Sequence, residues 1–78
     1  QSQVQCITQD NDGNLWIGTM AGLSKYNGLT FKNYNKRSGL AEDWITCSYK
    51  DEEGNIYFGH WGGSITKYIY LSCIWIIS

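Results

Sequence analysis

The chain has 78 residues, and its composition already excludes several classes of protein. A hydrophobic share of 42% argues against disorder, and a formal net charge of −1 leaves no basic footprint for nucleic acid. Three cysteines cannot pair completely within one chain, and no Cys-x-x-Cys spacing indicates zinc or redox chemistry. Nine glycines, no proline and 15% aromatic residues favour short strands joined by tight turns.

Four short strands are expected in the first half of the chain. Alternating strand-forming residues predict them over 4–9, 15–19, 22–26 and 29–34. Asp12-Gly13 and Asn27-Gly28 are hairpin signals, because glycine adopts a positive φ without a Cβ clash. The polar residues 35–39 are expected to form a loop, and residues 38–43 could form one helical turn. A second unit restarts with a strand over 44–49.

The second unit repeats the first at an offset of 41 residues, as from Gly13 to Gly54. Hydrophobic positions recur with similar residue types; for example, Tyr57 occupies the position that corresponds to Trp16. Four short strands at this period are typical of a β-propeller blade. We therefore predict an all-β fold of two four-stranded antiparallel blades, over residues 1–37 and 38–78, as a fragment of a larger propeller. The residues unchanged between the units are Cys6, Asp10, Gly13, Asn14, Gly18 and Gly22.

The end of the second unit departs from the repeat. Residues 69–77 are apolar on both faces and uncharged. They can pair as a fourth strand, but an exposed strand of this kind promotes aggregation. The run is also shorter than the roughly 20 residues that a membrane helix needs. We interpret this atypical strand as a truncation or junction, and the start at Gln1 as the mark of a processed or excised piece.

The first hairpin carries a motif that closely resembles the two-component regulator propeller repeat. The motif consists of Asp10, residues 13–19, residues 22–24 and Tyr26. The resemblance extends over residues 4–49 and, more weakly, over 50–68. In the weaker part Tyr57 and His60 stand where tryptophan and threonine are usual in the family.

The resemblance implies a sensor. Such repeats usually form propellers in the periplasmic or extracellular part of bacterial inner-membrane hybrid histidine kinases, many of which respond to oligosaccharides. It implies no cofactor and no catalytic residue, and membrane attachment only through parts of the receptor beyond this chain. Further blades, or self-association, would complete the ring. The alternatives are a structural or protein-interaction propeller piece that self-associates, or a non-catalytic part of a glycan-active propeller enzyme.

Candidate ligand contacts lie on one side of the predicted blades. The loops after the second and fourth strands of each unit share that side. An aromatic ring can stack on a sugar, and a few polar groups can bond its hydroxyls. The tentative site is therefore Trp61 with His60, and Trp44 with Arg37 and Asp43. Alternatively, both tryptophans pack between blades. His60 is expected to lie near solvent and to bind no metal.

Other motifs have simpler interpretations. Residues 10–14 do not fit a calcium loop, because Gly13 comes too early and Ala21 occupies the twelfth position, so we expect a hydrogen-bonded turn. Trp16 and Tyr57 recur once per unit and are expected to pack between blades.

Cys6 and Cys47 are expected to be small buried apolar residues rather than a disulfide, and Cys73 has no assigned role. A single histidine and serines outside any nucleophile-elbow context give no support for an enzyme.

Overall fold

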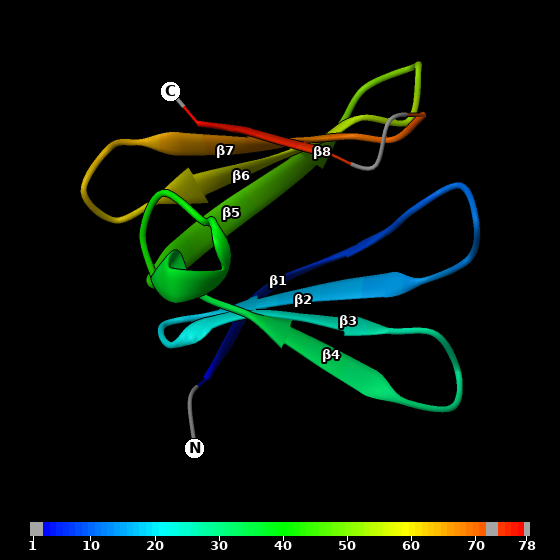
Figure 1. Cartoon of the computed structure of the whole chain (residues 1–78), viewed down its shortest axis with the longest axis horizontal. Coiled ribbons are helices and arrows are strands. Elements are labelled where there is room, and N and C mark those ends of the chain that lie inside the picture. Colours follow the sequence, from blue (N-terminus) through cyan, green and yellow to red (C-terminus); the bar gives the residue numbers. More distant parts are fainter. Residues whose placement is uncertain (1–2, 72–73, 78) are drawn as a thin grey trace.

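The computed structural model describes residues 3–71 and 74–77, and it shows two four-stranded antiparallel sheets (Figure 1). In each sheet the strands are hydrogen-bonded in sequence order, so every connection within a sheet is a hairpin. The predicted all-β fold of two antiparallel four-stranded units is confirmed. The strands are β1 (Val4–Gln9), β2 (Leu15–Thr19), β3 (Gly22–Tyr26), β4 (Phe31–Tyr34), β5 (Ile45–Lys50), β6 (Ile56–His60), β7 (Ile65–Ile69) and β8 (Ile74–Ile77).

Two local predictions were wrong in their boundaries. The fourth strand begins at Phe31 instead of residue 29, because Asn27 closes a longer turn. Its side-chain oxygen accepts the backbone N–H groups of Leu29 and Thr30, each at 2.9 Å. The fifth strand likewise begins one residue later than predicted, at Ile45.

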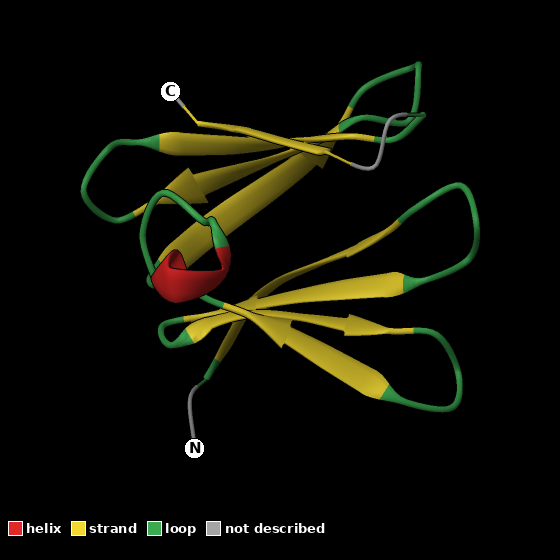
Figure 2. Cartoon of the chain, in the orientation of Figure 1, coloured by secondary structure: helices red, strands yellow, loops and turns green. Residues whose placement is uncertain are grey.

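The helical turn also lies earlier than predicted. It is a 3-10 turn, η1 (Lys36–Ser38), instead of a turn over 38–43. Asn35 caps its start by accepting the N–H of Ser38, and Gly39 ends it with φ 117°, a left-handed conformation that glycine adopts without strain. Figure 2 shows this turn in the connection between the two sheets. Since η1 has only three residues, the described part of the chain contains no helix able to cross a membrane.

The core lies between the two sheets, which pack face to face (Figure 1). The first strands of the two sheets, β1 and β5, contact each other, and the hydroxyls of Thr8 and Ser48 hydrogen-bond across this contact. Both sheets and the connection between them contribute large apolar side chains, so the two units share one hydrophobic core. Its buried members are Trp16, Leu23, Leu40, Ile45, Ile56, Phe58 and Tyr68.

Trp16 is the centre of this core. Its side chain is fully buried, and its ring centroid lies 4.8 Å from that of Tyr68 and 6.0 Å from that of Phe58, both in the second sheet. Tyr34 stacks on it from within the first sheet, at 5.9 Å. The prediction that Trp16 packs between the units is confirmed.

Equivalent residues of the two units differ in burial. Ile45 is 0% exposed, whereas Val4, at the same place in the repeat, is 55% exposed. The first sheet covers the face of the second sheet that carries Ile45. Within the described residues, no sheet packs against the face of the first sheet that carries Val4. The two units therefore repeat in sequence and conformation but not in environment.

The same asymmetry explains why the expected burial of the cysteines was wrong. Both are free thiols; Cys6 is half-buried against the core and Cys47 is exposed. In each unit the cysteine lies on the first strand, on the face directed toward a following unit. The second sheet partly covers Cys6, and the open face leaves Cys47 accessible. Cys73 lies outside the described residues.

Candidate ligand-binding surface

The loops divide between two sides of the molecule, as predicted from the strand directions. Residues 20–21, 35–44 and 61–64 lie on one side, on the left of Figure 1. The turns over 10–14, 27–30 and 51–55 lie on the other, on the right. The predicted contacts Arg37, Asp43, Trp44 and Trp61 all belong to the first side.

Hydrogen bonds fix the shape of these loops. The Asp43 carboxylate accepts the backbone N–H of Lys36 at 2.7 Å, which closes the long connection on itself. The Glu42 carboxylate accepts the backbone N–H of Gly62 at 2.9 Å and the hydroxyl of Ser64. The Ser64 hydroxyl and then the Gly62 N–H hold the pKa of Glu42 below its usual value. Glu42 thus joins the connection to the β6–β7 turn, a role that the sequence pattern does not indicate.

Trp44 and Trp61 form a stacked pair at the junction of these two loops. Their ring centroids are 5.1 Å apart and their planes differ by 20°. The Trp61 backbone N–H also donates to the Trp44 carbonyl oxygen at 3.2 Å. Trp61 is 70% exposed and Trp44 is half-buried, so the pair presents an aromatic ring supported from behind. Such a platform can stack on an apolar or sugar-like surface.

Comparison with known proteins identifies the family to which the repeat belongs. The family described as "Two component regulator propeller" matches residues 1–21 and 39–62, which is more than half of the chain. The chain belongs to the two component regulator propeller family. Both matched segments begin before the first strand of a sheet and extend beyond its second strand, so they cover the Gly-Asn hairpin of each unit.

Part of the chain is similar to a curated protein that is named as a histidine kinase. The chain is 56% identical over 34 residues to "Histidine kinase P4" of Formosa agariphila. The similar stretch covers 44% of this chain but 2% of the relative. The chain therefore spans a very small part of the length of the protein that it matches.

His60 does not lie near solvent, contrary to expectation. It is 5% exposed, and its Nε2 lies 2.7 Å from the Thr66 hydroxyl, while its Nδ1 lies 3.3 Å from the Trp44 carbonyl oxygen. A carbonyl oxygen accepts only, so Nδ1 carries the proton and Nε2 accepts from Thr66. The Thr66 oxygen in turn accepts the backbone N–H of Ala41 at 3.0 Å. His60 therefore supports the loop under the tryptophan pair instead of facing a ligand.

The remaining predicted contacts are less closely gathered. Arg37 is exposed on η1, and within the described residues no hydrogen bond or ion pair joins it to the tryptophan pair. Asp43 is exposed as well, and one of its oxygens is engaged by Lys36. The structure thus brings Trp44 and Trp61 together, places His60 behind them, and leaves Arg37 and Asp43 on the neighbouring loop.

The turn over 10–14 is a hydrogen-bonded turn, as predicted. Asp10 accepts the backbone N–H groups of Asp12 and Asn14, the side-chain amide of Asn14 and, at 2.8 Å, the indole N–H of Trp16. Burial alone would raise the pKa of Asp10, but these hydrogen bonds together hold it below its usual value. Asp51 repeats the arrangement in the second unit, with the Tyr57 hydroxyl in place of the indole.

The carboxylate oxygens of both turns are thus engaged by protein donors. In the part of the chain that the structure describes, no three His, Cys, Asp or Glu side chains gather closely enough to hold a metal ion.

Proposed function

We propose that this segment belongs to the extracytoplasmic ligand-sensing propeller of a two-component receptor, a hybrid histidine kinase of a bacterial inner membrane, and that it has no catalytic role of its own. Membership of a regulator propeller family and similarity to a histidine kinase support the receptor assignment. The proposed ligand is an oligosaccharide, contacted on the side of the loops that carry the tryptophan pair. The histidine kinase and its output would lie outside this chain.

The stacked Trp44–Trp61 pair is the observation that carries the proposal. Trp61 leaves 70% of its surface exposed, although burying an aromatic ring would be favourable. Trp44 supports it from behind, and the Glu42 clamp fixes its loop, so the ring is held in position before any ligand arrives. Preorganisation of this kind reduces the entropy lost on binding. Arg37 and Asp43 on the adjacent loop would bond sugar hydroxyls.

Substitution of Trp61 tests the proposal. We expect Trp61→Ala to weaken oligosaccharide binding about three- to tenfold, the equivalent of one aromatic stacking contact, with little change in melting temperature. Isothermal titration against a panel of neutral and acidic oligosaccharides, using the receptor's complete propeller, measures the first effect, and calorimetry the second. Leu29→Ala is the control, since Leu29 is also an exposed hydrophobic residue, 89% accessible, but lies in the turn over 27–30 on the opposite side of the molecule. A large fall in melting temperature with unchanged binding would assign Trp61 to packing instead.

A second candidate function, assembly through the open sheet faces, has a separate observation in its favour. Val4, Ile7 and Phe31 remain exposed on the outer face of the first sheet, and Tyr49 and Ile65 on the outer face of the second. In the repeat, the outer face of the first sheet corresponds to the buried face of the second sheet. The outer face of the second sheet corresponds to the buried face of the first sheet. Further blades, or other copies of the chain, would therefore cover these faces head to tail.

A further inference from the structure

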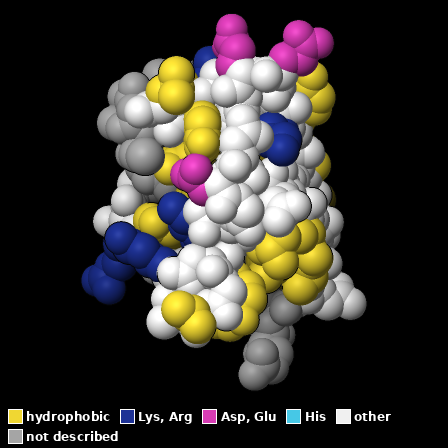
Figure 3. All heavy atoms as spheres, turned by 90° about the vertical axis from the view of Figure 1, so that its right-hand side faces the viewer, with side chains coloured by type: hydrophobic (Ala, Val, Ile, Leu, Met, Phe, Trp, Pro, Cys, Tyr) yellow, Lys and Arg dark blue, Asp and Glu magenta, His cyan; other side chains and the backbone are white. Residues whose placement is uncertain are grey.

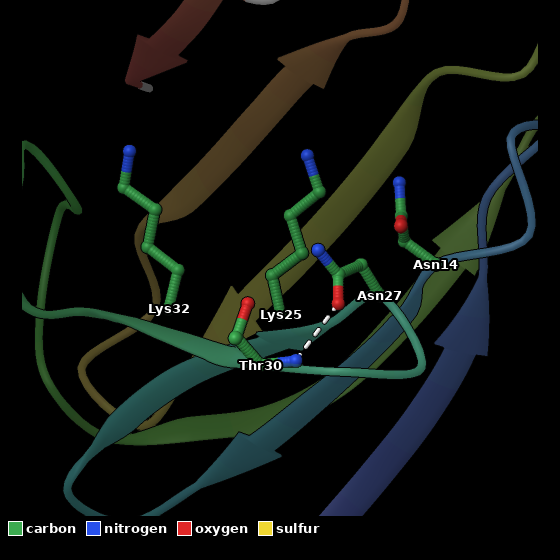
Figure 4. Close-up of a pocket in the computed structure, with 5 residues that line it drawn as sticks. All are labelled: Asn14, Lys25, Asn27, Thr30 and Lys32. Atoms are coloured by element: carbon green, nitrogen blue, oxygen red, sulfur yellow. Dashed lines mark hydrogen bonds between the residues drawn. The ribbon is translucent and has the colours of Figure 1, made fainter.

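A pocket on the side opposite the tryptophan pair has no role in the proposed sensing surface. Its volume is about 340 Å³, and it opens beside the turns over 10–14 and 27–30. Figure 3 looks onto this side and shows Lys and Arg side chains on the left and also on the right, with acidic side chains at the top and beside the basic group on the left. The lining residues are Asn14, Lys25, Asn27, Thr30 and Lys32, shown in Figure 4.

Two of these residues form a like-charged pair that costs the fold stability. Lys25 in β3 and Lys32 in β4 are direct cross-strand partners, and their side chains extend in the same direction (Figure 4). Equal charges at directly opposite positions of an antiparallel pair repel each other. Within the described residues, neither ammonium group forms an ion pair. Lys25 lies 5.0 Å from the centroid of the Trp16 ring and Lys32 lies 5.6 Å from that of Tyr34, contacts that orient the charges without neutralising them.

The other polar groups of the pocket add further donors. The side-chain oxygen of Asn27 already accepts two backbone N–H groups, so its amide nitrogen is the group left for a ligand, and it projects into the pocket in Figure 4. Thr30 adds a hydroxyl. Asn14 gives its amide to the Asp10 carboxylate, whose two oxygens accept four hydrogen bonds in all. That carboxylate is therefore not available to pair with either lysine as the structure stands.

The second unit provides an internal comparison. Lys67 corresponds to Lys25 in the repeat and likewise lies 5.0 Å from an aromatic centroid, that of Tyr57. Its cross-strand partner in β8 is Ile76, not a second lysine. The single lysine is thus part of the repeated framework, whereas Lys32 is an addition confined to the first unit.

We propose that this pocket binds a small oxyanion, a carboxylate or sulfate group, between the ammonium groups of Lys25 and Lys32, with the Asn27 amide as a third donor. An anion placed there relieves the repulsion between the lysines and receives charge-assisted hydrogen bonds. The group could be a free anion or a substituent of an acidic sugar, whose hydroxyls Thr30 and Asn14 would contact. The site lies on the other side of the sheets from Trp61 and does not depend on the proposed sensing function.

The test titrates the 78-residue chain, in whatever oligomeric state it adopts, because one sheet supplies all the lining residues. Lysine side-chain NMR resonances are followed with sodium D-glucuronate, sodium sulfate and, as the uncharged control, D-glucose, at constant ionic strength. We expect saturable shifts of Lys25 and Lys32 with both anions in about the millimolar range, and none with glucose. Lys32→Met should weaken binding about tenfold, the loss of one charged contact, and Lys32→Arg should retain it.

Lys36→Met is the matched control, because Lys36 is an exposed lysine in η1, on the other side of the molecule. Saturation with sulfate and glucuronate alike supports an oxyanion site, and tighter binding of glucuronate supports an acidic sugar as the source. Shifts that increase linearly without saturation, or that fall equally in Lys32→Met and Lys36→Met, overturn the proposal. So does binding that persists in Lys32→Met while its circular dichroism spectrum matches that of the parent chain.

Discussion

Replacing Asp10 by asparagine should destabilise the chain strongly, although the change preserves the shape of the side chain. Asp10 is 5% exposed and offers two acceptor oxygens to four donors, one of which is the indole N–H of the fully buried Trp16. Asparagine keeps one oxygen and replaces the other by an NH2 group. Whichever way the asparagine amide is oriented, its NH2 group then faces two of the four hydrogen-bond donors.

The magnitude follows from those two contacts. A hydrogen bond to a charged group contributes about 1.5–3 kcal/mol, and part of each loss is recovered by small shifts of the exposed turn, so we expect a loss of about 2–4 kcal/mol. A chain of 78 residues has a total stability of roughly 4–12 kcal/mol, so this loss is a large fraction of it. The matched control is Asp51→Asn, since Asp51 makes the same contacts but bonds the half-buried Tyr57 instead of a buried indole.

Urea unfolding followed by far-UV circular dichroism measures the effect, at one protein concentration because association would add to the apparent stability. We expect the midpoint to fall further for Asp10→Asn than for Asp51→Asn. A double-mutant cycle with Trp16→Phe, which removes the indole N–H, should give a coupling of more than about 1 kcal/mol. Equal effects of the two Asp→Asn variants, or a coupling near zero, would refute the reasoning.

Two further predictions concern acid and association. The pKa values of Asp10 and Asp51 are lowered in the folded chain, so the unfolded chain binds more protons in acid. The free energy of unfolding should therefore be constant above about pH 5 and fall as the pH drops below about 4. Unfolding measured at about pH 7 and about pH 3 should show a smaller loss for Asp10→Asn than for the parent chain. The open sheet faces should make the chain unstable or oligomeric in isolation. Light scattering should therefore show a mass above 8.9 kDa that rises with protein concentration. A monomer with a sharp calorimetric melt would contradict this expectation.

The sequence by itself determined the repeat and therefore the fold. Turn signals such as Asp12-Gly13 and strict alternation in residues 15–19 act locally, since a strand's two faces and a tight turn depend on neighbouring residues. Repetition at an offset of 41 residues then indicated two equivalent sheets, which the structure shows. The recurring aromatic position correctly indicated packing between units for Trp16, whereas its counterpart Tyr57 is half-buried, lies beside Tyr49 of its own sheet and does not belong to the core.

Tertiary structure decided the environment of each residue, which a repeat cannot specify. His60 looked like a surface residue, but a fold that brings Thr66 and the Trp44 carbonyl oxygen to its ring buries it. Cys47 was expected to be buried as a small apolar residue that recurs in both units, yet its own face of the sheet is open. Burial depends on what lies across the face of a sheet, and that is a contact between units, not a property of either unit's sequence.

The candidate sites divide in the same way. The sequence named Trp44 and Trp61 separately, as residues on the same side, but their stacking required the connection to fold back onto the β6–β7 turn through Glu42. Lys25 and Lys32 flank the Asn27-Gly28 hairpin, but a two-residue turn at Asn27-Gly28 would have paired Lys25 with Thr30. The longer turn closed by Asn27 pairs it with Lys32 instead. Local rules place residues on strands and sides, and only the packing of loops and sheets determines which of them meet.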